Sequence, residues 1–397
     1  MDGGREKGWR QLVSDGDDES PAGHGWPRRQ MRCVDLAPVA YLIPGRPKTA
    51  PIRKWRLAQD APISPPDPLS PPTVPRSWRA QQMGRRFMGQ SLATGSTESD
   101  YFKLLERDGS SLMHLVWAPP AKTIEDCLMK GKTKVDCHNY VRVMVQQANG
   151  RSLICGTNAF APKCREYQYS PDDESYRERR EFDGQAITPY DPRDNSTAVY
   201  LPHTNEIYAG TVSDFAGNDP LIYRKSLSDS GVDLRTQRDD VRVLESPNFV
   251  SSFADGEHVY FWYRETAAES VDDGGQRVYA RVARVCKSDR GGPRPSSDRW
   301  TSFVKARLNC SLPGNAPFYF DELQATSEPV TISDGSSVVY AVFTTPQSAV
   351  RMSAVCAFRM DDIRRLFDTG DFKVQKAVNS LWSPLRAYEL PKPRPGS

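Results

Sequence analysis

The sequence predicts an all-β fold, and a β-propeller in preference to a sandwich or a barrel. From Tyr101 onward, short runs of β-forming residues are bounded by Gly, Asp, Pro and Ser, a pattern typical of many short strands joined by turns. The run Val141–Val145 alternates valine with Arg142 and Met144, as a strand does when one face meets a core. The region spans almost 300 residues. That is long for a sandwich, whereas a propeller uses about 40–50 residues for each four-stranded blade.

The expected strands follow one another with little helical periodicity between them. They cover Tyr101–Leu105, Tyr140–Gln146, Ser152–Gly156, Thr197–Leu201, Glu206–Thr211, His258–Arg264, Val278–Cys286, Thr301–Leu308, Val338–Thr344 and Ser353–Met360. One short helix is expected near the C-terminus, over Asp361–Asp368, because Ile363, Leu366 and Phe367 recur at the spacing of one helical face. No exact repeat marks the blades, so periodicity alone supports the propeller only weakly.

Residues 1–99 have a different composition and are expected to be disordered. Thirteen prolines fall between Pro21 and Pro75, and basic residues are scattered without a period. Such a segment buries too little apolar surface to offset its ordering entropy. A basic, proline-rich stretch can serve as an SH3 or WW ligand, but a tail or a misassigned translation start is the simpler interpretation. Residues 100–397 are then the folded region.

Charge and hydropathy exclude several classes of protein. The formal charge is +3, from 53 basic and 50 acidic residues, a balance that suggests neither nucleic acid nor a membrane surface as the main partner. No run of 18 apolar residues is present, so no transmembrane helix is expected. The charged, Gly-rich first 30 residues do not resemble a signal peptide.

The eight cysteines point to an oxidising environment. Seven lie between Cys127 and Cys356, two pairs of them close in sequence. Metal binding is the alternative, but the spacings are too wide for a CxxC knuckle, and only five histidines are scattered through the chain. Two N-x-S/T acceptor sites, at Asn195 and Asn309, fit the same environment. Together these features indicate an extracellular protein with disulfides, although the N-terminus offers no route to secretion.

Catalytic motifs are scarce. The sequence contains no GxSxG elbow, HExxH or P-loop, and neither a cofactor nor a metal site is expected. Asp191 and Asp194 beside Tyr190 could imitate a glycosidase pair, but a turn is the better interpretation of Tyr190-Asp191-Pro192. The mixed-charge run Tyr176–Gly184 is expected to be a solvated loop, with a receptor-facing rim as its alternative.

Seven longer motifs resemble the sema domain of the semaphorins. They occur in family order and cover most of residues 101–396. The motifs are Asp136–Val143, Cys155–Cys164, Asn205–Arg224, Leu234–Val250, Val259–Glu265, Ala280–Gly292 and, most specific of all, Trp300–Gln324 (WTSFVKARLNCSLPGNAPFYFDELQ). Within the family they resemble most the invertebrate transmembrane semaphorins of class 1.

The resemblance implies a seven-bladed, disulfide-bonded β-propeller. It pairs Cys127 with Cys137, Cys155 with Cys164, and Cys310 with Cys356. Cys33 has no counterpart in the family, and the family's partner of Cys286 would lie just past the last residue, so neither is expected to form a disulfide within the chain. Against the family pattern, the chain looks truncated, with about four to five blades. About 20 residues also look skipped before Cys127, and marginal stability is expected.

The resemblance also implies a non-enzymatic signalling role. Semaphorins are guidance cues that bind plexin receptors, usually as homodimers, in axon guidance and cell–cell signalling. The family places a lysine-rich loop and the loop after strand Glu206–Thr211 on its plexin-facing surface. In this chain these are Lys130 and Lys132 in the first loop, and Phe215, Gly217, Asn218 and Asp219 in the second.

A dimer contact is expected near Phe261 and Tyr263, which share one face of a strand; simple packing within a blade is the alternative. An inert or interfering fragment and a propeller hydrolase are the alternatives to the signalling ligand.

Overall fold

The computed structural model describes the following residues: 33–35, 91–95, 101–106, 111–147, 150–170, 172, 175–228, 231–269, 277–315, 317–346, 351–375, 382–390 and 394. For residues 33–35, 91–95, 101–106, 111–115 and 387 it describes the backbone alone. The expected disorder of residues 1–99 lies outside the described residues, apart from the two short strands at 33–35 and 91–95.

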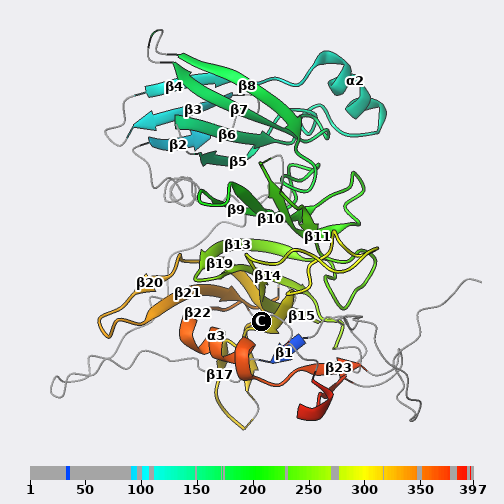
Figure 1. Cartoon of the computed structure of the whole chain (residues 1–397), viewed down its shortest axis with the longest axis vertical. Coiled ribbons are helices and arrows are strands. Elements are labelled where there is room, and N and C mark those ends of the chain that lie inside the picture. Colours follow the sequence, from blue (N-terminus) through cyan, green and yellow to red (C-terminus); the bar gives the residue numbers. More distant parts are fainter. Residues whose placement is uncertain are drawn as a thin grey trace, which may run out of the picture. The chain divides into compact units, whose positions relative to one another are not determined.

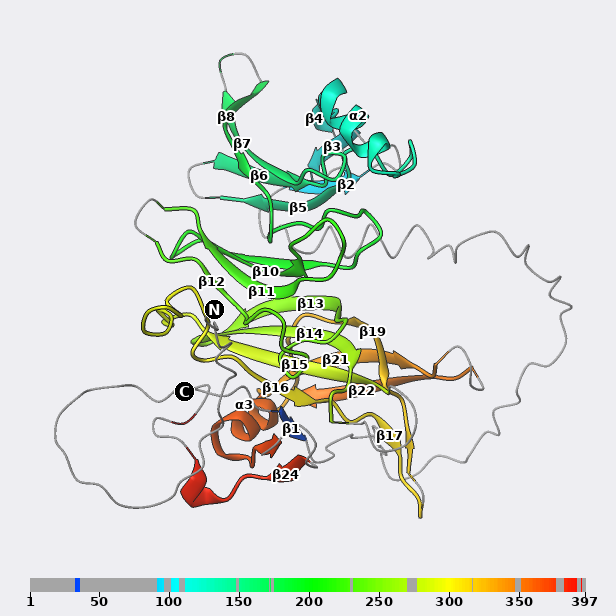
Figure 2. The ribbon, with the colours of Figure 1, turned by 90° about the vertical axis from the view of Figure 1, so that its right-hand side faces the viewer.

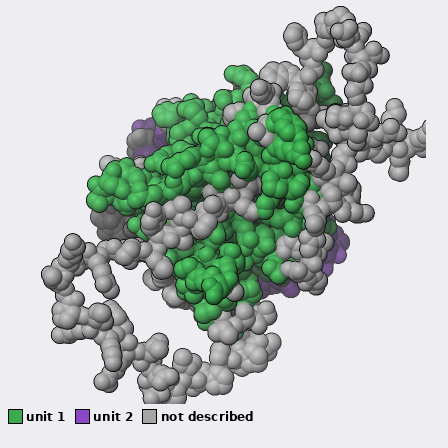
Figure 3. Space-filling view, turned by 90° about the horizontal axis from the view of Figure 1, so that it is seen from below, with its two compact units in different colours: residues 1–40, 193–397 green, residues 41–192 purple. Residues whose placement is uncertain are grey.

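The chain divides into two compact units, which are described separately. The larger unit takes residues 1–40 and 193–397, and the smaller unit takes residues 41–192 (Figure 3).

The smaller unit contains two antiparallel sheets, of order β2-β3-β4 and β5-β6-β7-β8, with helix α2 between them in sequence (Figure 1). The bounds are Ser91–Gly95 (β2), Tyr101–Glu106 (β3), Ser111–Val116 (β4), Ala121–Met129 (α2), Val141–Gln146 (β5), Arg151–Gly156 (β6), Lys163–Ser170 (β7) and Ser175–Asp183 (β8). Trp117, Ile154 and Tyr167 form its buried centre. The Arg165 guanidinium lies 4.5 Å from the centre of the Trp117 ring.

The larger unit begins with two four-stranded meanders, in which each strand pairs antiparallel with the next. Their bounds are Thr197–Leu201 (β9), Glu206–Val212 (β10), Pro220–Ser226 (β11), Leu234–Arg235 (β12), Asn248–Asp255 (β13), His258–Thr266 (β14), Val278–Cys286 (β15) and Val304–Arg307 (β16). Strand β1 (Cys33–Asp35) joins the second meander parallel to β16. Strands β23 (Lys373–Gln375) and β24 (Trp382–Pro384) extend the same sheet.

A third sheet in the larger unit is centred on β21 (Ser337–Thr344), which pairs with three other strands. These are β19 (Glu322–Thr326), β20 (Val330–Thr331) and β22 (Ser353–Arg359). A two-stranded hairpin precedes the sheet, made of β17 (Ser311–Leu312) and β18 (Phe318–Tyr319). Helix α3 (Met360–Thr369) follows it, and a short 3-10 turn, η3 (Ala387–Glu389), lies further on.

Strand β14 organises the core of the larger unit, because both of its faces are buried. Phe261 and Tyr263 belong to a cluster shared with β10 and β11. Tyr260 and Trp262 belong to a second cluster, shared with β21, β22 and α3. The sheet of β13–β16 therefore lies between the two neighbouring sheets, as Figure 2 shows. A strand buried on both faces reads as a continuous apolar run, and Val259–Tyr263 is such a run.

Helix α3 forms for the reason that its sequence suggests. Ile363 and Phe367 are buried on its inner face, and the Phe367 ring lies 6.4 Å from that of Tyr260. Beside them, the partly exposed Arg364 contacts Asp255 of β13 at 2.7 Å. The two contacts dock the helix against the middle sheet.

Most of the predicted elements are confirmed. The strands expected at Thr197–Leu201 and Val278–Cys286 have those bounds, and the expected helix Asp361–Asp368 lies within α3. The strand expected at Thr301–Leu308 is shorter, because its first residues fold around Asp289, whose carboxylate accepts hydrogen bonds from the backbone of Thr301 and Ser302.

The solvated loop predicted for Tyr176–Gly184 is wrong: strand β8 occupies almost all of it and pairs with β7 along its length. Most of its side chains are exposed. Because polar residues occupy both faces of the strand, the sequence lacks the alternation of apolar and polar residues that marks a half-buried strand. Arg165 of β7 forms ion pairs with two side chains of β8, Glu181 at 2.7 Å and Glu178 at 3.3 Å.

Helix α2 was not predicted. It begins directly after Pro120 and buries only Cys127 among its residues, so its apolar stripe is too short to stand out in the sequence.

Candidate functional site

Three disulfides lie in the described part of the chain, one of them closing a candidate loop, and the pairing is the one expected from the resemblance. Cys127 is bonded to Cys137, Cys155 to Cys164, and Cys310 to Cys356. Cys155 and Cys164 face each other across the β6–β7 pair. The metal alternative has no support within the described segments, where no cluster of three or more His, Cys, Asp or Glu could hold an ion.

The other two cysteines, Cys33 and Cys286, were expected to form no disulfide within the chain. Cys286 is buried at the end of β15 and takes part in none of the three disulfides. Its backbone N–H donates to the Ser302 hydroxyl at 3.0 Å. The side chain of Cys33 lies outside the described residues.

The first disulfide closes a compact knob, residues 127–137, at the end of α2. Gly131 has a φ of +80° and turns the chain away from the helix. Thr133 and Asp136 then lock the following turn: the Thr133 hydroxyl donates to the Asp136 carboxylate at 2.6 Å, and the Asp136 N–H donates back at 3.2 Å. The Tyr140 hydroxyl donates to the Val135 carbonyl at 2.8 Å. A closed, hydrogen-bonded loop of this kind is preorganised for binding.

Lys130 and Lys132 are placed differently on the knob. Lys130 follows the last turn of α2 and is exposed. Lys132 is half-buried, with its ammonium 4.4 Å from the centre of the Phe160 ring and 4.0 Å from the Asp191 carboxylate. Lys132 therefore fastens the knob to its own unit, whereas Lys130 lies on the surface.

Apolar side chains are exposed beside these lysines. Met129 is 78% exposed and Val135 is 67% exposed, so both apolar side chains lie largely in solvent. Apolar groups with charged neighbours are the usual centre of a protein interface. Sequence reasoning missed both residues, because neither stands out from the β-like texture around it.

Phe160 is supported by an unusual backbone. Asn158, Ala159 and Phe160 all have positive φ, from 44° to 58°, and are buried. A left-handed conformation costs roughly 1–2 kcal/mol for each such residue. The Asn139 side chain stabilises the turn by accepting the Asn158 N–H at 2.9 Å, and Cys155–Cys164 closes it.

The second candidate loop, residues 213–219, joins β10 to β11. At its base, the Ser213 N–H donates to the Asp219 carbonyl at 2.9 Å. Asp214 accepts the N–H groups of Ala216 and Asp219, at 3.2 Å and 2.7 Å. At its tip, Gly217 has a φ of +80°, which glycine adopts without steric cost.

The side chains of this loop do not share one environment. Gly217 and Asn218 are exposed, and Phe215 is half-buried. The Asp219 carboxylate turns back onto the unit, accepting a hydrogen bond from the Ser213 hydroxyl. It also contacts Arg235 at 2.6 Å and Arg238 at 3.3 Å. The two arginines were not predicted as site residues, although both lie in the family motif Leu234–Val250.

Electrostatics explain why Asp219 stays charged there. Burial alone would raise the pKa of this carboxyl, but hydrogen bonds from Arg235 and Ser213, with the charges of both arginines, lower the pKa below its ordinary value.

Phe261 and Tyr263, expected near a dimer contact, are both fully buried. The Tyr263 ring lies 5.4 Å from the Phe249 ring within the same cluster. The role that the structure shows for them is therefore packing between sheets. A dimer contact near this strand stays a prediction, and these side chains could act on it only through the sheet that they support.

The two acceptor asparagines lie on connecting segments. Asn195 is exposed just before β9, and its amide donates to the Asn248 side chain at 3.0 Å. Asn309 is half-buried between β16 and β17, beside the buried Cys310. Glycosylation at either position stays a prediction.

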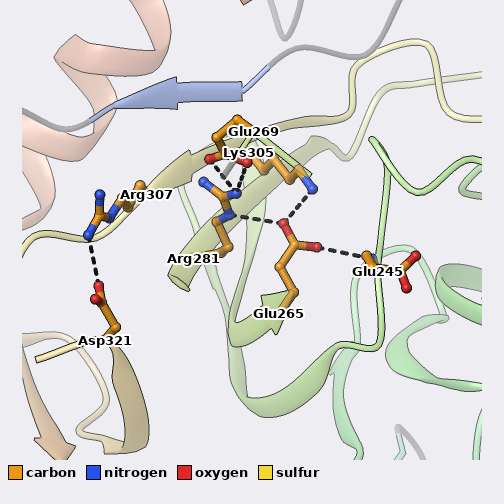
Figure 4. Close-up of polar contacts among 7 residues, drawn as sticks. All are labelled: Glu245, Glu265, Glu269, Arg281, Lys305, Arg307 and Asp321. Atoms are coloured by element: carbon orange, nitrogen blue, oxygen red, sulfur yellow. Dashed lines mark hydrogen bonds and ion pairs between the residues drawn. The ribbon is translucent and has the colours of Figure 1, made fainter. Parts of the chain in front are cut away.

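A group of charged residues lies inside the larger unit (Figure 4). The Glu265 carboxylate contacts Arg281 at 2.9 Å and Lys305 at 2.5 Å, and Arg281 also contacts Glu269 at 2.6 Å. Glu265, Arg281 and Lys305 are almost completely buried. Two carboxylates and two cations balance in charge, so each buried charge has a partner of opposite sign.

Comparisons with known proteins point in one direction. A family model of the Sema domain matches residues 323–397. Semaphorin-1A of Drosophila melanogaster is 46% identical over an alignment of 320 residues, which covers 75% of this chain and 34% of that protein. Semaphorin-6A of Mus musculus is 43% identical over 71% of this chain and 26% of its own length. The chain thus spans about a third of the length of these curated relatives.

Solved structures of semaphorins also match this chain. Drosophila Semaphorin 1b, extracellular domains 1–2, superposes with a TM-score of 0.70 and 44% identity, over 77% of this chain and 57% of that one. A structure of Drosophila Plexin A in complex with Semaphorin 1b matches with a TM-score of 0.70 and 44% identity, over 78% and 57%. The successive antiparallel sheets are therefore blades of a β-propeller of the sema type, as the sequence predicted.

Proposed function

Because this chain belongs to the semaphorin family, we propose that it acts as an extracellular signalling ligand for a plexin receptor, with guidance of growing axons as its setting. The observation that carries the proposal is the match, at 44% identity, to a solved complex of Plexin A with Semaphorin 1b. Disulfides in both units suit an oxidising, extracellular compartment. The proposed action is binding without catalysis.

Two loops are the proposed receptor contacts. The knob offers Lys130 beside exposed Met129 and Val135, with Lys132 as its anchor. The loop between β10 and β11 offers Gly217 and Asn218, with Phe215 at its edge and Asp219 at its base. Both are short, closed and hydrogen-bonded, so little conformational entropy is lost when a partner binds.

The direct test is binding of the whole chain to a plexin ectodomain, by surface plasmon resonance. We expect Lys130→Glu and Asn218→Arg each to weaken binding about tenfold, equivalent to about 1.4 kcal/mol. Arg351→Glu, an exposed cation on neither loop, is the matched control and should leave affinity unchanged. A chain that binds no plexin ectodomain would refute the proposal.

A homodimer is the proposed signalling form, since two copies would bring two receptors together. Sedimentation velocity over a range of concentrations checks this. A single monomeric species at every concentration tested would argue against dimers of this chain.

No helix of the described segments is long and apolar enough to cross a membrane. The extracellular setting is tested by expression through a secretory pathway. Asn195→Gln should then remove one glycan from the secreted chain, measured by mass.

A further inference from the structure

Asp219 holds the base of the loop between β10 and β11 through both its side chain and its backbone. Its Oδ1 atom contacts Arg235, and its Oδ2 atom contacts both Arg238 and the Ser213 hydroxyl. Its backbone N–H and C=O are used as well, by Asp214 and by the Ser213 N–H. Its polar groups therefore hold the loop together, and its side chain is only 18% exposed, so a receptor group has little access to the carboxylate.

The partners of Asp219 come from a different part of the sheet. Arg235 is the last residue of β12, which pairs with β11. Its side chain is 13% exposed, so it is almost out of reach of a partner. Arg238 follows three residues later, and its side chain is 59% exposed. One carboxylate thus links the base of the loop to the buried arginine and to the exposed one.

The tip of the loop is tied to its base through Asp214, whose carboxylate accepts the Ala216 N–H at 3.2 Å and whose carbonyl accepts the Gly217 N–H at 3.4 Å. A β-carbon on Gly217 would meet nothing within 4 Å, and the exposed Ala216 and Asn218 flank it. The position of the tip depends on how firmly the base is held. Removing the charge at the base would release Arg235 and Arg238 and let the tip sample more conformations, and a partner would have to reverse that gain in entropy on binding.

We propose that Asp219 is a positioning residue for the tip Ala216–Asn218, acting through Arg235, and that Arg238, held beside the base of the loop, is a further contact residue for the receptor. This inference rests on the proposed function, because it concerns the same loop. It differs from the family expectation, in which Asp219 itself faces the receptor.

The test is a double-mutant cycle measured on the whole chain. Asp219→Asn and Arg235→Gln are made separately and together, and binding to a plexin ectodomain is measured at low and at moderate salt. We expect each single change to weaken binding about five- to tenfold, and the double variant to bind no more weakly than the worse single variant, since both remove one clamp. The salt dependence of the association rate should not change, because a clamp charge does not meet the partner.

The control is Asp233→Asn, the same substitution at the residue just before β12. Asp233 pairs with Lys225 at 2.6 Å, away from the loop, and its variant should bind normally. Arg238→Gln should both weaken binding and reduce the salt dependence of association, as a contacting cation does.

Two results would overturn the inference. One is an Arg235→Gln variant that binds like the unsubstituted chain while Asp219→Asn loses both affinity and salt dependence, because Asp219 would then contact the receptor directly. The other is unchanged hydrogen exchange of the 213–219 amides in the unbound Asp219→Asn variant. The exchange measurement needs no receptor. If the chain binds no plexin, the proposed function is refuted, but hydrogen exchange still shows whether Asp219 holds the loop in place.

Discussion

The bond between Cys155 and Cys164 shows what a single pair of residues does in this molecule. It lies within the smaller unit, and both cysteines have no exposed surface. It closes the segment in which three consecutive residues have positive φ. A cross-link lowers the conformational entropy of the unfolded chain, and the stability gained in this way helps to offset that local cost.

Removing this disulfide should therefore destabilise the fold. For Cys155→Ala with Cys164→Ala, we expect the free energy of unfolding to fall by about 2–3 kcal/mol, the range for a small closed loop. Urea denaturation followed by tryptophan fluorescence measures it. Cys286→Ala is the control, since that residue forms none of the disulfides and its loss should be clearly smaller. Equal losses would contradict the stabilising role assigned to the bond.

At the scale of the element, the middle sheet of the larger unit combines an apolar strand with buried charges. Strand β14 ends near Glu265, which meets Arg281 of β15 and Lys305 of β16 (Figure 4). The three strands are adjacent in one antiparallel sheet, so the charges lie side by side. A buried carboxylate between two cations is costly to remove alone, because the cations remain desolvated.

Glu265→Gln should accordingly reduce the free energy of unfolding by about 3–5 kcal/mol. The matched control is Glu181→Gln on β8, whose partner Arg165 is partly exposed; there we expect a loss below about 1 kcal/mol. Both values come from chemical denaturation at neutral pH. Similar effects at the two positions would show that the buried network contributes no more than a surface pair.

Glu269 makes the same network sensitive to acid. Burial alone would raise the pKa of this carboxyl, but the charge and hydrogen bonds of Arg281 outweigh burial, and its pKa lies below the ordinary value of 4.5. A lowered pKa in the folded state contributes stability above the pKa of the unfolded chain, and the contribution is lost as pH falls through the folded value.

The unsubstituted chain should then exceed Glu269→Gln in stability above pH 4.5, and the difference should shrink as the solution is acidified further. Denaturation at a series of pH values measures this difference. A difference that stayed constant down to strongly acidic pH would mean that Glu269 does not titrate in this range.

At the scale of the larger unit, the sheets share residues across their boundaries. Trp262 of β14 lies 5.7 Å from the Phe358 ring of β22 and 6.1 Å from the Phe253 ring of β13. Its neighbours Phe261 and Tyr263 point into the cluster with β10 and β11. A change on one face of β14 thus reaches both neighbouring sheets.

Trp262→Ala should reduce stability by about 3–5 kcal/mol, as large-to-small changes of buried aromatics do. Amide hydrogen exchange should increase together in β10–β11 and in β21–β22. Tyr388→Ala is the control, because this ring is 75% exposed. Faster exchange in β21–β22 alone would show that the sheets unfold independently.

Prediction from sequence succeeded where the local pattern carries the structure. The bounds of β9 and β15 and the position of α3 follow from apolar period and turn residues. It failed for β8, whose exposed edge allows charges on both faces, and for α2, which buries a single residue. The candidate site stays a prediction: the family resemblance suggested both loops but did not separate Lys130 from Lys132 by exposure.

By itself, the sequence determined the all-β class, most of the strands, the cysteine pairing through its family motifs, and the family. These depend on residue type and spacing along the chain. Only the tertiary structure decided which side chains face outward: Met129 and Val135 are exposed, Phe261 and Tyr263 are enclosed between sheets, and Asp219 turns toward Arg235 and Arg238. Such contacts join segments that fold against one another, and their geometry depends on packing that no local pattern encodes.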